Sequence, residues 1–426
     1  MGYIKTEIKE GIKLHVINTN KFKTNFIVIF ITCPLNRETV TLNSILPAVL
    51  RRGTSKLETM EKINTELENM YGASFDCGIE KKGDNHIIKF YIESINDKYL
   101  PENENILNKS IDIVLDIILN PLLEDGGFNK KYIEQEKETI RQLIESKIDS
   151  KKAYSLDRCI EEMFKSENYG LYKNGYSEDL ENINFKNLYE YYLKMLSESK
   201  IDIFVSGEVD EKYIIENISK KINLEKRNPI VLIDNNISTI SKVNEIEEKM
   251  DVNQGNLVMG LRVENIDEKD MFATSIYNTI LGLGGNSKLF QNVREKASLA
   301  YTANSTYLKQ KNVIFIRCGI ETDNYQKTLD IIKVQLDDLK KGNFTEKDIE
   351  NAKILIENSI ISLADEQPEQ ITYYIGQELL GTNLSEDEYI ENIKGVTKEE
   401  IVRVANGINI DTIYFLTTNN MEVKGE

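Results

Sequence analysis

The stretch GFNKKYIEQEK at residues 127–137 is repeated in altered form as NFTEKDIENAK at residues 343–353. Both copies hold a phenylalanine, an Ile-Glu pair and a lysine at the same spacing. Three more pairs of similar segments occur in the same order along the chain: 90–94 with 318–322, 181–183 with 391–393, and 201–205 with 412–416. Four matches at offsets of about 210 to 230 residues indicate that the chain consists of two duplicated halves.

Each half has the same predicted order of strand, helix, strands, helices and strand. Continuous apolar runs at residues 26–31 and 256–261 predict one buried strand in each half. Apolar residues at steps of three and four predict amphipathic helices at residues 56–70, 106–118, 134–148 and 349–363. Because strands and helices are segregated, we predict an α+β fold of two duplicated α/β sandwiches, each with one sheet covered by helices.

The boundary between the halves is predicted from composition. Residues 223–251 are polar, contain Pro229 and the run Asp-Asn-Asn at 234–236, and lack a sustained apolar period. These features are typical of a linker. We therefore expect an N-terminal half at residues 1–222, a linker at 223–251 and a C-terminal half at 252–426.

The composition argues against several classes of function. The 426 residues include 53 Lys and Arg against 70 Asp and Glu, which gives a net charge of −17. A field of that sign repels phosphate backbones, so we expect no nucleic-acid partner. The chain holds only two histidines, His15 and His86, and a metal site built on several histidines is therefore nearly excluded.

Four cysteines are scattered along the chain without a CxxC pair. They are Cys33, Cys77, Cys159 and Cys318. This pattern is typical of buried thiols in a reducing cytosol rather than of a disulfide framework. The longest apolar run near the start, residues 26–33, is far shorter than the roughly 20 residues that span a bilayer, and the N-terminus has no signal-peptide pattern. We expect a cytoplasmic protein without a membrane partner.

A glycine-rich stretch, LGLGGNSKLF at residues 281–290, has some likeness to a nucleotide-binding loop. It lacks the third glycine of GxGxxG and the Gly-Lys-Ser/Thr of a P-loop, and it follows a helical pattern rather than a strand. We predict instead a turn between two helices, with glycines at positive φ and with Asn286 or Ser287 capping the second helix.

The residues that follow carry a resemblance to a known family. LFQNVRE at residues 289–295, followed by LAY at 299–301, resembles a signature of the insulinase-like (M16) zinc metallopeptidases. The resemblance covers essentially the whole chain. It implies duplicated α+β halves that are joined by a linker and close like a clamshell around an unfolded peptide.

This resemblance implies that Arg294 and Tyr301 bind substrate. Both side chains suit the role, because a guanidinium offers forked donors to peptide carbonyls or carboxylates and a phenol can donate to a developing oxyanion. The alternative is a surface Arg-Glu pair together with a tyrosine that packs on the sheet.

The same resemblance implies a zinc site of the form His-x-x-Glu-His with a distal Glu in the first half, where the histidines bind the metal and the first Glu is the general base. When the chain is aligned on Arg-Gly-Thr at 52–54, the corresponding residues are Ser44, Pro47 and Ala48, and the distal position is Leu143. No ligand remains. We therefore expect no cofactor in this chain and zinc only in a partner chain.

Two further expectations concern this region. Proline is compatible with a helix only near its first turn, so we expect Asn43 or a neighbour to cap the helix that contains Pro47. His15 and His86 lie outside any HxxEH spacing and on strand-like segments. For each, a solvated or hydrogen-bonded strand histidine is favoured over a metal ligand.

The pattern resembles the zinc-less subunit of two-chain M16 peptidases, and most of all the zinc-less insulinase-like proteins of Gram-positive bacteria. It implies a catalytically inactive subunit that pairs with an HxxEH-bearing homologue and binds unfolded or extended peptide; a homodimer is also compatible with the sequence. A link of this group to modification of elongation factor P has no independent support in the residues of this chain. Two alternatives remain: a stand-alone peptide-binding or scaffold protein that adds peptides to a sheet edge, and an active enzyme with an unrelated metal-free site.

Overall fold

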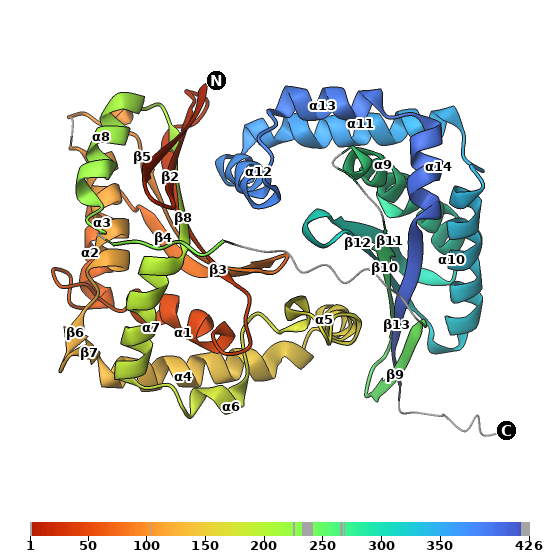
Figure 1. The fold of residues 1–426 in the computed structure, drawn as a ribbon, viewed down its shortest axis with the longest axis horizontal. Helices are drawn as coiled ribbons and strands as arrows, with labels where there is room; N and C mark the ends of the chain where they lie inside the picture. Colours follow the sequence, from red (N-terminus) through yellow and green to blue (C-terminus); the bar gives the residue numbers. More distant parts are fainter. Residues whose placement is uncertain are drawn as a thin grey trace. The chain divides into compact units, whose positions relative to one another are not determined.

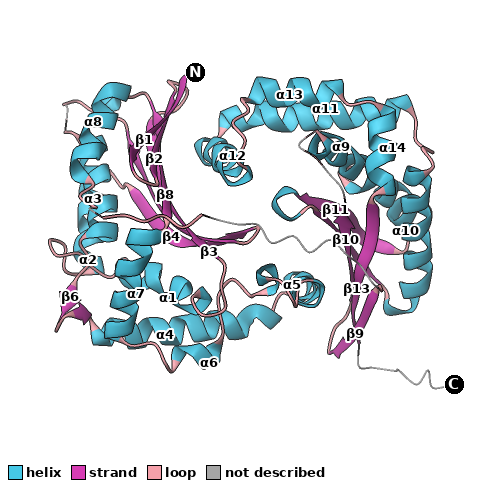
Figure 2. Cartoon of the chain, in the orientation of Figure 1, coloured by secondary structure: helices cyan, strands magenta, loops and turns pink. Residues whose placement is uncertain are grey.

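The structure is a computed structural model, and it describes residues 2–102, 104–224, 226–231, 242–264, 267 and 269–418. It divides into two compact units (Figure 1). The first unit comprises Met1–Glu145, Leu171–Ile233 and Asp365–Ile375, and the second comprises Ser146–Gly170, Asp234–Ala364 and Gly376–Glu426. Each unit contains one large sheet with helices packed on it (Figure 2), which confirms the predicted α+β fold.

The first unit is built on a six-stranded sheet with the order β1-β2-β8-β3-β5-β4. Its strands are β1 (Gly2–Lys9), β2 (Ile12–Asn18), β3 (Thr24–Pro34), β4 (Ser74–Lys82), β5 (Asn85–Ile95) and β8 (Lys200–Gly207). Strands β2 and β8 are parallel, and the other neighbours are antiparallel. Strand β3 is buried along nearly its whole length, because it has neighbours on both edges and helices on its face.

Helices and a short hairpin complete the first unit. They are α1 (Val40–Leu50), α2 (Met60–Asn69), α3 (Ile106–Leu119), β6 (Leu123–Glu124), β7 (Gly127–Phe128), α4 (Lys130–Glu145), α6 (Ser177–Leu180), α7 (Phe185–Glu198) and α8 (Glu211–Lys221). In Figure 1, α3 and α8 lie on the same side of the sheet. Helix α3 buries Ile111, Val114 and Ile118 at steps of three and four, so its apolar stripe faces the core.

The second unit has a five-stranded sheet with the order β11-β12-β10-β13-β9. Its strands are β9 (Asn244–Met250), β10 (Gly255–Val263), β11 (Ala300–Leu308), β12 (Val313–Ile320) and β13 (Ile408–Thr418). Its helices include α5 (Lys151–Met163), α9 (Asp270–Gly282), the π-helix η4 (Phe290–Lys296), α10 (Tyr325–Lys340), α11 (Glu346–Ser362), α13 (Glu386–Gly395) and α14 (Lys398–Asn406). Helix α12 (Gln367–Leu380) begins in the first unit and ends in the second.

The two sheets repeat one topology. The order β2-β8-β3-β5-β4 in the first corresponds to β9-β13-β10-β12-β11 in the second, and the parallel pair is the same in both. The helix after the central strand ends with a C-cap at Arg51 in the first unit and at Leu283 in the second. The tripeptide Ser-Lys-Leu follows at 55–57 and again at 287–289, at the same offset. The predicted duplication is therefore confirmed.

A helical segment from the first half of the sequence packs on the second sheet. Residues 146–170 belong to the second unit, where α5 packs on β10 and β13 (Figure 1). Met163 and Phe164 join an apolar cluster with Val258 and Phe315 of the sheet. Full burial of such side chains contributes roughly 1.5 to 3 kcal/mol each, so this segment is an integral part of the second core.

A buried cluster of charges fixes the same segment to the second sheet. The Glu167 carboxylate lies 3.1 Å from Lys311 Nζ and 2.8 Å from an Arg262 Nη. The side chains of Glu167 and Lys311 are each only 1% exposed. A carboxylate that two cations share in this way is compensated for its loss of hydration.

The reciprocal segment, residues 365–375, belongs to the first unit. Gln367 Nε2 donates to the carbonyl and the hydroxyl oxygen of Ser206 at 3.0 Å each, and the ring of Tyr374 stacks on Tyr3 at 3.9 Å between centroids. The compact units therefore differ from the contiguous halves at 1–222 and 252–426. Hydrophobic patterns along the chain do not tell which of two sheets a helix will cover.

The predicted linker at 223–251 also differs from the structure at its end. Residues 232–241 lie outside the described residues, whereas Asn244–Met250 form β9, which pairs in parallel with β13. Every second side chain of β9 is exposed, as expected for a strand with polar residues at the edge of a sheet.

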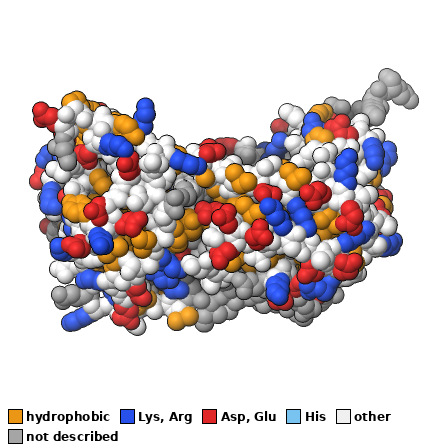
Figure 3. All heavy atoms as spheres, turned by 90° about the horizontal axis from the view of Figure 1, so that it is seen from above, with side chains coloured by type: hydrophobic (Ala, Val, Ile, Leu, Met, Phe, Trp, Pro, Cys, Tyr) orange, Lys and Arg blue, Asp and Glu red, His pale blue; other side chains and the backbone are white. Residues whose placement is uncertain are grey.

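The cysteines and the surface charges follow the predictions in part. Cys33, Cys159 and Cys318 are buried, Cys77 is half-buried, and all four are free thiols. On the face shown in Figure 3, Lys and Arg side chains of the described residues are interspersed with Asp and Glu and form no extended basic patch. Within the described part of the chain, no helix is long and apolar enough to cross a membrane.

Candidate functional site

The positions predicted to replace a zinc site lie on α1 and α4 of the first unit. Ser44 is buried, and its hydroxyl has no hydrogen-bond partner among the described residues. Ala48 is half-buried on the same helix, and Leu143 of α4 is 45% exposed. A hydroxyl, a methyl group and an isobutyl group offer none of the imidazole or carboxylate donors that zinc binds, so these residues do not fit the metal. Nowhere in the described ranges do three or more His, Cys, Asp or Glu side chains form a group that could hold a metal ion.

The expectation for Pro47 is wrong. Helix α1 begins at Val40, so Pro47 lies deep inside it rather than in its first turn. Asn43 is not a cap: its amide donates to His86 Nδ1 at 3.2 Å, and its oxygen accepts from the Tyr191 hydroxyl at 2.6 Å. An internal proline costs a helix about 3 kcal/mol. The cost is offset because α1 is buried along nearly all its length, and tertiary packing overrides local propensity.

Both histidines are buried, hydrogen-bonded strand residues, as the sequence favoured. His15 Nε2 lies 2.9 Å from Asp202 Oδ1, and its Nδ1 lies 2.8 Å from the Tyr3 hydroxyl. His86 accepts the bond from Asn43, and burial, together with the positive charge of Lys81, lowers its pKa to about 4. His86 is therefore neutral at physiological pH.

The predicted substrate-binding residues of the second unit lie at a tight reversal of the chain. Arg294 is on the π-helix η4, and π-helical turns are frequent at functional sites. The helix is closed by two backbone bonds, from Leu299 N to Val293 O at 3.0 Å and from Ser298 N to Arg294 O at 3.1 Å. Ser298 adopts a left-handed conformation with φ of 52°. This closing turn leads directly into β11, which carries Tyr301.

The turn differs in one detail from the prediction for the glycine-rich stretch before it. Gly284 has the expected positive φ, of 82°. The Ser287 hydroxyl, however, donates to the Gly284 carbonyl at 2.8 Å and does not accept from the start of the next helix. The serine therefore stabilises the turn itself, and the predicted side-chain cap is wrong.

Tyr301 is the extra residue of a β-bulge. Ala300 pairs with Ile320 and Thr302 with Gly319, so that Tyr301 has no partner of its own on β12. A bulge redirects the side chain of the extra residue, and bulges are enriched at sheet edges and beside active sites. The Tyr301 side chain is accordingly 64% exposed.

Arg294 and Tyr301 line one open hollow of about 430 Å³ in the second unit. The Tyr301 hydroxyl donates to Glu321 Oε1 at 3.1 Å, and this bond raises the pKa of the phenol. The Arg294 guanidinium lies 4.7 Å from the centre of the Phe290 ring. A cationic donor, a phenolic donor and the carboxylate of Glu321 therefore converge on one hollow.

Glu321 is a site residue that the sequence did not single out. It follows the last residue of β12, and only the pairing of β11 with β12 brings it beside Tyr301. Its equivalent in the internal repeat is Glu93, which was matched only as part of a strand-like segment. Strand register cannot be read from such a segment alone.

Comparisons with known proteins agree with this architecture. A family model described as the peptidase M16 inactive domain matches residues 182–356. A protein of Bacillus subtilis, the probable inactive metalloprotease YmfF, is 33% identical over 420 residues, which cover 98% of each chain. The chain belongs to the M16 peptidase family. The matching family model and this relative are both described as inactive, and the chain is an inactive member of the M16 family. Neither of its histidines lies in an HxxEH motif.

Solved structures extend the similarity to the whole fold. A conserved protein from Enterococcus faecalis has a TM-score of 0.88 at 28% identity, with all of both chains covered. The M16 inactive domain from Pseudomonas fluorescens has a TM-score of 0.80 at 14% identity, with 99% of each chain covered. A second Bacillus subtilis relative, the uncharacterized zinc protease YmxG, is 20% identical over 92% of each chain.

Proposed function

We propose that this chain is the non-catalytic subunit of a two-chain M16 peptidase. It would pair with a zinc-bearing homologue, which supplies the metal and the general base, and would contribute Arg294 and Tyr301 to substrate binding. The observation that carries the proposal is a contrast between the two sets of residues. Ser44, Pro47 and Ala48 offer no zinc ligands, whereas Arg294 and Tyr301 line a single open hollow.

The chemistry of the hollow supports peptide binding. Arg294 is 46% exposed, so its guanidinium can donate to a peptide carbonyl or carboxylate without losing a buried partner. The Tyr301 hydroxyl is protonated at physiological pH, and hydrogen bonding to Glu321 raises its pKa further. Its single O–H bonds Glu321 in the free chain, so donation to a developing oxyanion requires the hydroxyl to turn from Glu321 towards the substrate.

The position of the strand that carries Tyr301 favours the binding of an extended peptide. Strand β11 is at the edge of its sheet, and within the described ranges no strand pairs with its outer side. An unpaired edge offers backbone donors and acceptors to which an extended peptide can add as a further strand. The same feature would serve a stand-alone peptide-binding or scaffold protein, which is the second candidate function.

The existence of both types in one organism supports pairing. Bacillus subtilis holds a relative named as a probable inactive metalloprotease and another named as a zinc protease. A partner for this chain would be such a zinc-type homologue from its own organism. We infer a cytoplasmic location for the pair from the four free thiols.

The experiment that tests the proposal is reconstitution with the zinc-type homologue. Peptide cleavage is measured for the homologue alone, for its mixture with this chain, and for its mixture with the Arg294→Ala, Tyr301→Phe double variant. The proposal expects the mixture to exceed the homologue alone and the double variant to lose most of the gain. Binding of peptides without any effect on the homologue would instead support the scaffold function.

A further inference from the structure

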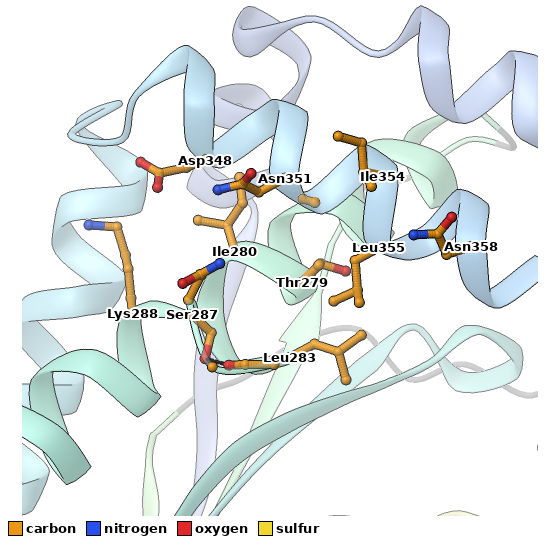
Figure 4. A pocket seen from close by; sticks show the side chains of 14 residues that line it. Thr279, Ile280, Leu283, Ser287, Lys288, Asp348, Asn351, Ile354, Leu355 and Asn358 are labelled. Atoms are coloured by element: carbon orange, nitrogen blue, oxygen red, sulfur yellow. Dashed lines mark hydrogen bonds between the residues drawn. The ribbon is translucent and has the colours of Figure 1, made fainter.

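A second hollow, of about 270 Å³, lies between the turn after α9 and the helix α11 (Figure 4). Ile280, Leu283 and Leu355 form apolar parts of its wall. Asp348, Asn351 and Asn358 contribute polar groups along α11. This hollow has none of the residues that line the Arg294 and Tyr301 hollow.

The internal duplication shows which positions of the first unit correspond to this hollow. Helices α4 and α11 align at an offset of 216 residues: Ile133 and Ile140 correspond to Ile349 and Ile356, and all four are buried. At this offset Glu136 corresponds to Ala352, and Tyr132 to Asp348. The turns after α1 and α9 align at 232 residues through their C-caps and the repeated Ser-Lys-Leu, so that Arg52 corresponds to Gly284.

In the first unit an arginine side chain fills this space. Arg52 Nε donates to Glu136 Oε1 at 2.5 Å, and the guanidinium lies 5.6 Å from the centre of the Tyr132 ring. Glu136 is buried. In the second unit the equivalent residues are Gly284 and Ala352, which have no side chains that could form such a pair, and the space is open.

A carboxylate is still present in the second unit, one helical turn nearer the start of the helix. Asp348 Oδ2 accepts from the backbone and the hydroxyl of Thr345 at 2.8 Å each, while its Oδ1 has no hydrogen-bond partner among the described residues. The same holds for the side-chain amides of Asn351 and Asn358. The oxygens of Asp348 and Asn351 can therefore accept hydrogen bonds at the place that an arginine occupies in the other unit, while Asn358 lies about 15 Å beyond Asp348 along α11 (Figure 4).

Lys288 also borders the hollow, but its charge has a precedent in the first unit. Its equivalent, Lys56, coexists there with Arg52. Each lysine is turned towards an aspartate of a neighbouring helix, Lys56 towards Asp116 at 3.2 Å and Lys288 towards Asp338 at 3.9 Å. Lys288 is therefore partly neutralised from outside the hollow.

We propose that this hollow binds the guanidinium group of an arginine side chain that a partner polypeptide presents. The guanidinium has five N–H donors and no acceptor, which suits the oxygens of Asp348 and Asn351, one turn apart on α11. The methylene stem would pack on Ile280 and Leu355. The net charge of −17 attracts a cationic segment at long range. The proposal does not depend on a zinc-bearing partner.

The test is a titration of the full chain, with Ile and Leu methyl groups labelled for NMR, by N-acetyl-arginine N-methylamide. We expect saturable shifts of the Ile280, Leu283 and Leu355 methyl signals with a Kd on the order of 1 mM, and none at Ile133 or Ile140. The citrulline analogue, which has a similar shape and no charge, should bind about tenfold more weakly. Equal affinity of the two probes, or no saturable shift, would overturn the proposal.

Two substitutions fix the placement of the ligand. Asp348→Asn retains an acceptor for Thr345 and should weaken the arginine probe about tenfold, whereas Ala352→Glu restores the carboxylate of the first unit and should strengthen it by a similar factor. Glu350→Gln, at an exposed position of α11 that does not line the hollow, is the matched control and should change affinity less than about twofold. If Asp348→Asn bound the arginine probe as tightly as the wild type, or if Ala352→Glu bound it more weakly, the guanidinium would not be bound here.

The source of the arginine is tested with the free amino acid. Asp348 and Lys288 are the charged residues among those that line the hollow. The proposal places Asp348 on the guanidinium, and Lys288 is turned towards Asp338, so the α-amino and α-carboxylate groups of free L-arginine should gain little there. We expect free L-arginine to bind no more tightly than the capped probe. Binding about tenfold tighter would identify a free amino acid as the ligand and overturn the polypeptide part of the proposal.

Discussion

Five strands of each unit share one order, but the space beside the helix after the central strand, α1 or α9, differs between the units. In the first unit Arg52 and Glu136 fill it as an ion pair. In the second unit Gly284 and Ala352 leave a hollow of about 270 Å³. A duplicated framework can therefore keep its topology while the chemistry at an equivalent place is lost or gained, because strand order depends on apolar patterning and not on these side chains.

The equivalent edge strands β4 and β11 differ in a related way. Strand β4 pairs with β5 in unbroken register from Ser74 opposite Glu93. Strand β11 instead has a bulge at Tyr301, which brings the phenol to Glu321. One inserted residue thus turns a regular strand edge into one that presents a hydrogen-bonding side chain.

The largest expected effect concerns the two segments, 146–170 and 365–375, that pack in the unit formed mainly by the other half of the sequence. Glu167→Ala removes the carboxylate that Lys311 and Arg262 share in a buried place, and should lower the free energy of unfolding of the second unit by about 3 to 5 kcal/mol. Gln367→Ala, in the segment 365–375 of the first unit, removes neutral hydrogen bonds and should lower the free energy of unfolding by only about 1 kcal/mol. Hydrogen exchange of the β10 and β3 amides, with urea unfolding, measures the two effects separately. Similar losses in both variants would contradict the view that buried charge holds the segment 146–170 in the second unit.

The filled space of the first unit should be sensitive to loss of one partner. Glu136→Ala leaves the partly buried Arg52 without its carboxylate and should cost about 2 kcal/mol of unfolding free energy, after allowance for the exposure of Arg52. Removing both partners, as Arg52→Gly with Glu136→Ala, should cost at least about 1 kcal/mol less than the sum of the single changes. Strict additivity in this double-mutant cycle would show that the pair does not stabilise the first unit.

The effect of pH on stability that His86 causes should have no counterpart in the second unit, because His86 corresponds to Ile314 in the repeat. The pKa of His86 is lowered to about 4 in the folded chain, whereas that of an unfolded histidine is about 6.5. The unfolded state then binds more protons between these values, so this contribution to stability is present above about pH 6.5 and is lost as the pH falls towards 4.

At pH 5 the loss due to His86 should reach about 2 kcal/mol relative to pH 7.5. Urea unfolding of the wild type and of His86→Gln at both pH values isolates it, because all other titrating groups are common to the two proteins. The variant should lose about 2 kcal/mol less than the wild type. Equal losses would mean that His86 titrates normally in the folded chain.

The smallest expected effect on stability lies in the Arg294 and Tyr301 hollow. Both side chains are well exposed, so Arg294→Ala with Tyr301→Phe should change the free energy of unfolding by less than about 0.5 kcal/mol. The same variant should weaken peptide binding in the reconstituted pair by about tenfold or more. Lys296→Ala, on the same π-helix, is the matched control. A large loss of stability in the double variant would reveal a structural role instead.

Most of the framework could be predicted because apolar periodicity marks buried strands and helices directly. The strand expected at 26–31 lies within β3, and the helix expected at 106–118 lies within α3. Strand β9 was missed because Glu248 occupies one of its more enclosed positions. The Tyr154 and Tyr414 hydroxyls donate to this carboxylate at 2.6 and 2.8 Å, and no pattern within β9 itself reveals these distant partners.

The site could be predicted only in part for the same reason. The motif predicts Arg294 and Tyr301 as substrate-binding residues, and it does not contain Glu321, which follows β12 and bonds Tyr301. The Arg52 and Glu136 pair, and the hollow that replaces it, depend on contacts between a turn and a helix more than 60 residues apart. Such contacts are set by tertiary packing and leave no periodic signal in the sequence.

In the proposed function, this chain has no metal or peptidase activity of its own and completes the substrate site of a zinc-bearing homologue. The most direct test is zinc content and peptide cleavage for the purified chain, for the homologue, and for their equimolar mixture. We expect no zinc and no cleavage for the chain alone, and cleavage by the mixture at least about tenfold above that of the homologue. Stoichiometric zinc or peptide cleavage by the chain alone would contradict the account.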